Sequence, residues 1–305
     1  MSVAAIGTSR SGRMTFAVPL RRWLGNQTRI MRASPLGMVG IVVVAFFLAV
    51  AVLAPFLAPH DPFEMLKGSA GFASLVPPGS EFLLGTTDLG YDVLSQLLLG
   101  TRTTMVVGLT AGIVSIFIGA NIGLWAGYFG GRADQVIMRL TDVVYGMPFL
   151  PFILVLMSLF GKSWWYLVIA IVVILWRTPA RVIRAQVIGI RKRQFVIAAR
   201  ARGCSDLRIM YRHIVPNILP LIMLYGAFNV ATAVVTEAGI SFLGFGDPDR
   251  ISWGTMLYDL WSSGHSRVAW WWFAAPSTCI VLLVTAFVFV SRAYEEEANP
   301  RLKGR

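Results

Sequence analysis

The sequence predicts an all-α protein that crosses a membrane six times. Of its 305 residues, 56% are hydrophobic and only 14% are charged. The mean hydropathy of +0.68 lies far above that of an ordinary soluble domain. Uncharged runs near 20 residues long follow one another, and a helix of about 20 apolar residues crosses the hydrocarbon of a bilayer. Lysines and arginines gather at the edges of these runs, as they do in membrane proteins.

The first run, 33–59, follows a basic segment that contains six arginines and no acid. A basic start before a hydrophobic run is also the pattern of a secretory signal. This run is longer than the apolar part of a signal, so we expect an uncleaved first span.

Five further uncharged runs follow, at 103–131, 143–161, 163–176, 214–236 and 269–291. The run 163–176 is too short to cross a bilayer alone. Arg177, Arg181 and Arg184 recur at i, i+4 and i+7, so they share one face of a helix that continues this run. We expect their side chains to extend to the cytoplasmic headgroups.

The distribution of basic residues predicts the orientation. With the N-terminus inside, 22 of the 27 lysines and arginines fall on the cytoplasmic side, and the outer side holds Lys67, Arg102, Lys162, Arg250 and Arg267. Both termini are therefore expected in the cytoplasm. The predicted division is a basic segment at 1–34, a six-span domain at 35–292 and a cytoplasmic tail at 293–305. A cytoplasmic loop covers about 185–213.

Two outer loops are expected, at about 60–102 and 241–270. The leucines that precede residue 100 suit a short helix lying on the membrane surface. Trp270, Trp271 and Trp272 suit the headgroup level.

The sequence contains no motif typical of nucleic-acid binding, nucleotide binding, metal binding or catalysis. The net charge of +12 does not form a basic patch interleaved with aromatics, so nucleic acid is not expected as a partner. The sequence Gly161-Lys162-Ser163 lacks the earlier glycine of a phosphate-binding loop. The histidines are scattered, neither cysteine belongs to a metal-binding spacing, and no nucleophile has a partner at fixed spacing. We expect no catalytic residues, no metal site and no bound cofactor.

Three features inside the spans are candidates for function. Glycines recur every fourth residue in two groups, and they form a smooth face on one helix. This face is either a packing seam in a transport core or ordinary helix packing. The glycines are Gly108, Gly112, Gly119, Gly123 and Gly127. Arg139 and Asp142 are spaced i, i+3 and predict an ion pair at the membrane interface. Glu237, at the outer end of the fifth span, either lines a translocation path or contacts interfacial water.

The segment 195–217 is the region most open to a partner in the cytoplasm. Ala198 and Ala199 leave a helix nearly bare on one side, Gly203 permits a turn, and Ser205 or Asp206 can begin a second short helix. Such a helix-turn-helix suits a groove on a partner protein. An amphipathic helix held by anionic lipid is the alternative.

These residues resemble the EAA loop of the permeases of ABC importers. Ala198, Ala199, Gly203 and Pro216 match that loop, whereas Ile197 stands where it usually has glutamate. More specifically, the chain resembles the permeases for dipeptides, oligopeptides and nickel. The resemblance is carried by GTTDLGYDVLS at 85–95, GYFGGRAD at 127–134, MRLTD before Pro148, SFLGFG at 241–246 and SWGTML at 252–257. Tyr91 and Gln96 depart from that family, which commonly has arginine at both places.

The resemblance implies a type I importer permease in a bacterial inner membrane, with a cytoplasmic coupling helix. Its partners would be a second permease subunit, two ATPase subunits that bind ATP and Mg, and an extracytoplasmic substrate-binding protein. The implied substrate is a di- or oligopeptide, with nickel or another small solute as the alternative. A membrane-embedded enzyme or assembly factor is the alternative from another class. The residues implied to couple to the ATPase are Ala198, Ala199, Arg200, Arg202, Gly203, Asp206, Arg208, His213 and Pro216.

Overall fold

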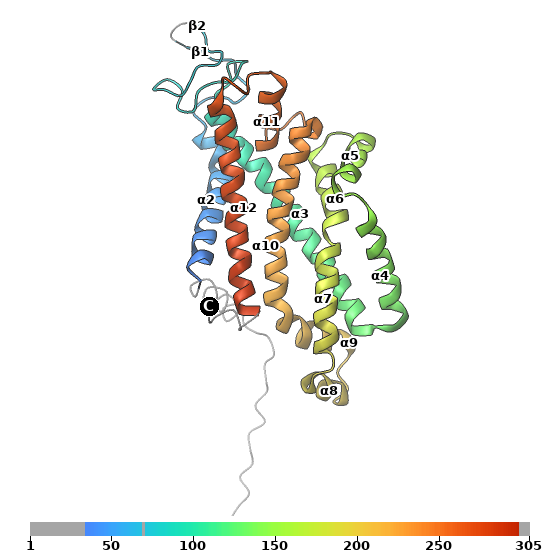
Figure 1. Cartoon of the computed structure of the whole chain (residues 1–305). Coiled ribbons are helices and arrows are strands. Elements are labelled where there is room, and N and C mark those ends of the chain that lie inside the picture. Colours follow the sequence, from blue (N-terminus) through green and yellow to red (C-terminus); the bar gives the residue numbers. More distant parts are fainter. Residues whose placement is uncertain (1–33, 69–70, 299–305) are drawn as a thin grey trace, which may run out of the picture.

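The protein is an upright bundle of helices with a two-stranded hairpin at one end and two short helices at the other (Figure 1). This computed structural model describes residues 34–68 and 71–298. The predicted basic segment therefore lies outside the described residues, apart from Ser34. The hairpin, β1 (Lys67–Gly68) and β2 (Gly71–Phe72), marks what we call the hairpin end. The opposite end, with α8 (Gln194–Ala201) and α9 (Asp206–Ile209), is the loop end.

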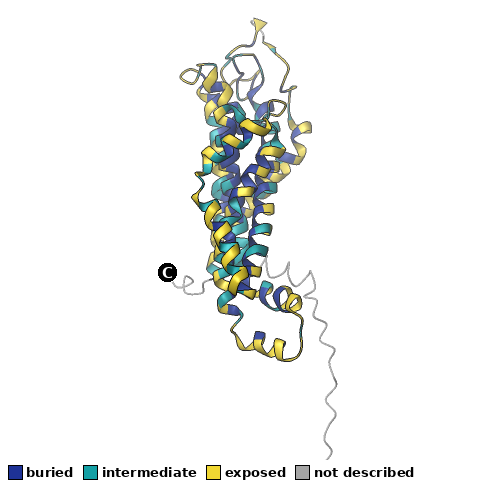
Figure 2. Cartoon of the chain, turned by 90° about the vertical axis from the view of Figure 1, so that its right-hand side faces the viewer, coloured by how far each residue is buried: buried dark blue, intermediate teal, exposed yellow. Residues whose placement is uncertain are grey.

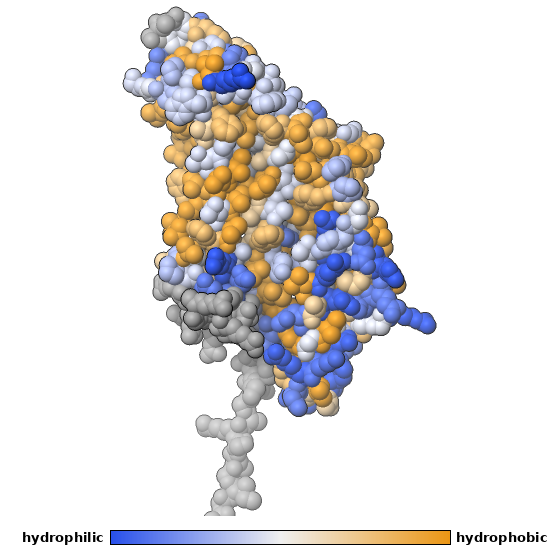
Figure 3. Space-filling model, in the orientation of Figure 1, coloured by the Kyte–Doolittle hydropathy of each residue, from blue (hydrophilic) through white to orange (hydrophobic). Residues whose placement is uncertain are grey.

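The prediction of an all-α membrane protein is confirmed. In the described part of the chain, five helices are long and apolar enough to cross a membrane, and a bent pair makes a sixth crossing if it is counted as one. Apolar residues cover the middle of the bundle, and hydrophilic residues gather at the loop end (Figure 3).

The first crossing is α2 (Pro35–Leu57). It begins where the Ser34 hydroxyl accepts a hydrogen bond from the backbone N–H of Gly37, and Pro35 occupies the first helical position, where no N–H is needed.

The second crossing, α3 (Val93–Phe129), corrects one expectation. The leucines before residue 100 do not form a separate surface helix, because they are the start of this single 37-residue helix. Asp92 caps it by accepting hydrogen bonds from the N–H and hydroxyl of Ser95, at 3.0 and 2.6 Å. No proline interrupts the chain after that cap, so nothing ends the helix before Gly130.

The third crossing is bent. The run 143–161 contains the end of α4 (Gly131–Gly146) and all of α5 (Phe149–Phe160), and the chain bends by 86° between the two helices. Pro148 explains the break, because a proline ring forces the preceding residue out of the helical region, and Met147 is extended at φ −79° and ψ 126°.

The fourth crossing combines α6 (Trp164–Leu175) and α7 (Arg177–Ile190), so the short apolar run does continue as expected. The fifth is α10 (Val215–Ile240). It is preceded by a π-helical turn, η1 (Met210–Ile214), and followed by another, η2 (Ser241–Phe245). After the short α11 (Trp253–Ser262), α12 (Trp270–Ala298) makes the last crossing.

The glycine face of α3 lies at the centre of the bundle. A Cβ added to Gly108 or Gly112 would lie 2.4–2.5 Å from Val234 or Val230 of α10. A Cβ on Gly119 or Gly123 would lie 2.4 Å from a backbone oxygen at Trp176 or Ala180, and Gly127 likewise abuts α7. The glycines therefore form a seam within this chain, where α3 approaches α10 and α7 backbone to backbone.

Candidate functional site

The loop end presents a helix-turn-helix. α8 stops at Ala201, and the chain turns through Gly203, whose φ of +78° lies in the region that side chains disfavour. The N–H of Gly203 donates to the Arg200 carbonyl at 2.9 Å, and the N–H of Cys204 donates to that of Ala199 at 3.2 Å. These bonds satisfy carbonyls at the helix end. The turn expected at Gly203 is therefore present, and it is formed by the positive φ of Gly203 and by these two backbone hydrogen bonds.

The inner face of this helix-turn-helix is packed. Val196 and Ala199 of α8 are 0% and 1% exposed, and Ile209 is fully buried. They join one cluster with α3 and α7, through side chains that include Leu124 and Ile183. Burying these apolar side chains fixes which way the two short helices face.

The outer face is open and apolar. Phe195, Ile197 and Leu207 are 37%, 55% and 55% exposed, and Ala198 is exposed between them. We call this set, with Arg202 and Arg208, the loop face; the exposed residues at this end stand out in Figure 2. Among the described residues, Arg208 has no ion-pair partner, and the Arg202 side chain donates only to the Ala198 carbonyl, at 3.2 Å. The surface combines large apolar side chains with basic ones.

The candidate residues of the segment therefore divide into two groups. Ala198, Arg202, Gly203 and Arg208 are exposed at the loop face, whereas Ala199 is buried beneath it. Two others point back to α3, since the Tyr128 hydroxyl donates to Asp206 Oδ1 at 2.5 Å and accepts from Arg200 at 3.3 Å. The hydrogen bond to Tyr128 raises the pKa of Arg200 above its ordinary value. His213 is half-buried in η1, and Pro216 is exposed in the first turn of α10.

The predicted ion pair between Arg139 and Asp142 is wrong. Asp142 instead accepts from Arg181 of α7 at 2.6 Å. A second pair joins Arg184 to Asp134, also between α7 and α4. The arginine row therefore faces the carboxylates of α4 rather than the headgroups alone, and the charges are satisfied between helices, which spacing along one helix does not reveal.

Tyr145 completes this contact between α4 and α7. Its ring lies 4.7 Å from the Arg177 guanidinium and 4.1 Å from that of Arg181. Arg177 also donates to the Val144 carbonyl at 2.7 Å, just before the bend of the third crossing. The Val144 carbonyl also accepts from the Met147 N–H at 3.3 Å, so a cationic donor adds to the backbone bond where α4 ends.

Glu237 does not contact interfacial water, which was one of the two positions expected for it. It is 1% exposed, inside the bundle near the hairpin end. Its carboxylate accepts from the hydroxyls of Thr104 at 3.2 Å and Ser241 at 2.9 Å. Thr104 in turn accepts from the Trp253 N–H at 3.3 Å. Buried carboxylate oxygens require hydrogen-bond donors. The donors to Glu237, together with the Trp253 bond to Thr104, link α3, α10 and α11.

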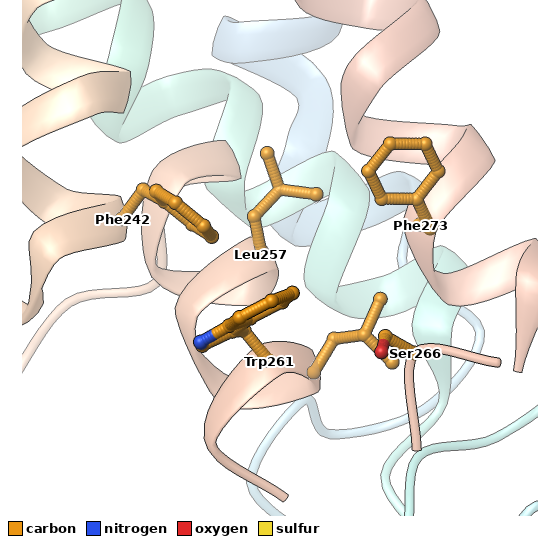
Figure 4. Close-up of a pocket in the computed structure, with 6 residues that line it drawn as sticks. Phe242, Leu257, Trp261, Ser266 and Phe273 are labelled. Atoms are coloured by element: carbon orange, nitrogen blue, oxygen red, sulfur yellow. The ribbon is translucent and has the colours of Figure 1, made fainter. Parts of the chain in front are cut away.

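The described residues line two hollows at the hairpin end, and sequence reasoning missed both. One, of about 450 Å³, is almost wholly apolar (Figure 4). It lies between η2, α11 and α12 and is lined by Phe242, Leu257, Leu260, Trp261, Ser266 and Phe273. The signal available in the sequence was the aromatic residues of this region: Phe242 and Trp261 lie inside the expected outer loop, and Phe273 follows it.

The second hollow, of about 230 Å³, is acidic. Asp88 and Asp259 line it together with Thr87, Tyr91 and Gln96. Desolvation by the surrounding protein, with the nearby charge of Asp88, raises the pKa of Asp259 to about 6. The two carboxylates are far apart in the sequence, so only the fold brings them together.

Comparison with known proteins gives two family matches. The model described as binding-protein-dependent transport system inner membrane component matches residues 119–303, more than half of the chain. The model described as the N-terminal TM domain of oligopeptide transport permease C matches residues 25–78.

Individual relatives cover nearly the whole chain. A dipeptide transport system permease protein of Bacillus subtilis is 32% identical over 90% of this chain and 85% of its own length. An oligopeptide transport system permease protein of Mycobacterium bovis is 32% identical over 96% of both chains. A di/tripeptide transport system permease protein of Pseudomonas aeruginosa is 31% identical over 87% and 88%.

Among solved structures, an inward-facing methionine ABC transporter chain aligns with a TM-score of 0.54. The alignment covers 69% of this chain and 97% of that chain, at 16% sequence identity. At this identity the comparison shows a similar fold.

Proposed function

Because the chain belongs to the family of binding-protein-dependent transport system inner membrane components, we propose that it is the permease subunit of an ATP-driven peptide importer and couples to ATPase subunits through its loop face. Three relatives named above are permeases for dipeptides, di/tripeptides or oligopeptides, and they support a peptide substrate. The predicted orientation puts the loop face and both termini in the cytoplasm, where ATP is available.

The observation that carries the proposal is the loop face itself. Ile197 and Leu207 each expose more than half of their surface. Apolar surface has a higher free energy in water than in a protein groove, so binding in such a groove is favourable. The basic side chains at its edge favour a groove with acidic walls. Since Ile197 replaces the usual glutamate, we propose that shape and arginine contacts hold the ATPase here.

The complete importer would contain a second permease subunit, two ATPases with ATP and Mg, and an extracytoplasmic binding protein. Closure of the ATPases would move the α8–α9 segment and switch the membrane path between its two sides. The chain would supply no catalytic residue and bind no cofactor. Among the glycines, the seam from Gly108 to Gly127 would keep α3, α7 and α10 in close contact during that switch.

Co-purification and uptake test the proposal. From detergent-solubilised membranes, the wild-type chain should retain an ATP-hydrolysing partner, and Ile197→Asp should retain several-fold less because a charge replaces an apolar contact. The control is Glu64→Gln, which changes a charged side chain that is exposed at the hairpin end. It should leave ATPase retention unchanged. In a strain lacking this chain, uptake of labelled di- and oligopeptides should be lost while nickel uptake persists. Loss of nickel uptake alone would refute the peptide assignment.

A further inference from the structure

At the end of α3, one hydroxyl group bonds to both α8 and α9. Tyr128 is 4% exposed, and its hydroxyl bonds both to Asp206 at 2.5 Å and to Arg200 at 3.3 Å. Asp206 is the first residue of α9, and Arg200 lies in the last turn of α8. One side chain of α3 therefore holds both short helices.

The same end of α3 is fastened to α7. Arg191, which follows α7, donates from Nη1 to the carbonyls of Gly127 and Tyr128, both at 3.0 Å. These carbonyls lie in the last turn of α3, where no helical N–H follows to pair with them and a cation is favoured. A Cβ on Gly127 would lie 2.8 Å from the Arg184 carbonyl oxygen, so α7 is in close contact. The ends of α3 and α7 and both short helices form one connected cluster.

The segment reaches α10 and α3 by different routes. η1 leads directly into α10, so α10 receives any movement through the chain itself. α3 is not continuous with the segment and is linked to it by side chains. Besides Tyr128, the exposed Tyr211 hydroxyl donates to Asn121 at 2.6 Å. Water can replace that exposed bond, whereas the Tyr128 bonds are charge-assisted and part-buried.

We propose that the Tyr128 hydroxyl, with Asp206 and Arg200, is the joint that carries movement of the α8–α9 segment into α3. This inference rests on the proposed function, since it assumes that an ATPase moves the segment. Tyr128 lies behind the loop face and is a positioning residue. Through the glycine seam, α3 then passes the displacement to α7 and to the outer half of α10.

The experiment uses the complete importer in liposomes and measures peptide transported per ATP hydrolysed. Tyr128→Phe keeps the buried ring and removes the hydroxyl, so this ratio should fall about fivefold or more, while the amount of bound ATPase stays at the wild-type level. Asp206→Ala should reproduce the fall, and Asp206→Asn, which keeps an acceptor oxygen, should restore most of the ratio. Tyr166→Phe removes an exposed hydroxyl from α6 and should match the wild type.

The two readouts separate the joint from the function on which it rests. A wild-type ratio in Tyr128→Phe, or a fall that merely follows loss of bound ATPase, would overturn the joint. Absence of bound ATPase from the wild-type chain would overturn the proposed function instead.

Discussion

Gly203 is required for its backbone conformation and not for lack of space. An added Cβ would meet no atom within 4 Å, yet φ is +78°. We expect Gly203→Val to abolish uptake while the protein still inserts, because a left-handed conformation costs an ordinary residue about 1–2 kcal/mol and a β-branched one more. Uptake and ATPase retention measure the effect.

Gly203→Asn is the matched comparison. Asparagine adds bulk but adopts positive φ more readily than other side chains. It should keep clearly more uptake than Gly203→Val, and equal loss in both variants would show that size at the loop face matters instead.

The acidic hollow gives a pH-dependent prediction. The pKa of Asp259 is about 6 in the folded protein and 3.8 ordinarily, so the folded state holds the proton more tightly. Below about pH 4 the carboxyl is protonated in both the folded and the unfolded state. Between about pH 4 and pH 6 the unfolded state releases its proton first, so the free energy of unfolding falls; above about pH 6 it stays level. Asp259→Asn should therefore gain thermal stability over the wild type at pH 7.5 but not at pH 4. Because the side chain is partly in water, the gain should be about 1 kcal/mol or less. An equal gain at both pH values would contradict this assignment.

The contact between α3 and α10 leaves no room for a methyl group at Gly112. A Cβ there would lie 2.5 Å from Val230 Cγ2 and 2.7 Å from its Cα, so the backbone of α10 would have to move. Gly112→Ala should destabilise the protein by about 1–3 kcal/mol, seen as a lower unfolding temperature in detergent. Gly146→Ala, where nothing lies within 4 Å of the added carbon, should change it little. Similar losses in both would argue against the seam.

Patterns within one helix were predictable, and contacts between helices were not. Apolar length gave the crossings, and the i, i+4, i+7 arginine spacing gave a shared face on α7. The pairing of Asp142 with Arg181 joins residues 39 apart, and Glu237 meets Thr104 across 133 residues. Sequence spacing contains no information on which helices pack together. It therefore indicated Arg139, on the same helix, as the partner of Asp142.

The segment at the loop end shows the same division. Gly203 as a turn followed from the residue type, since glycine alone enters this conformation freely. Which alanine of the pair is buried depends on how α8 packs into the apolar cluster that it shares with α3, α7 and α9, so Ala198 and Ala199 could not be told apart. The role of Tyr128 was hidden because it lies in an apolar run 78 residues before Asp206.

Across the whole molecule, the charge asymmetry predicts that the loop end faces the cytoplasm. In a variant with both native cysteines replaced by serine, Gln194→Cys and Ser80→Cys place single thiols at exposed positions on opposite ends. A membrane-impermeant maleimide should label Ser80→Cys in intact spheroplasts, and Gln194→Cys only after the membrane is opened. The reverse labelling would invert the topology.

The π-helical turn η1 sets the rotational phase between α9 and α10, which it connects. A π turn contains about one residue more than an α turn, so side chains beyond it are offset by about 100° from an uninterrupted α-helix. The side-chain positions of α10 are therefore offset by about 100° from those that an uninterrupted continuation of α9 would have. Deleting one residue from η1 would remove this offset and rotate α9 by about 100° relative to α10, which would turn Asp206 away from Tyr128.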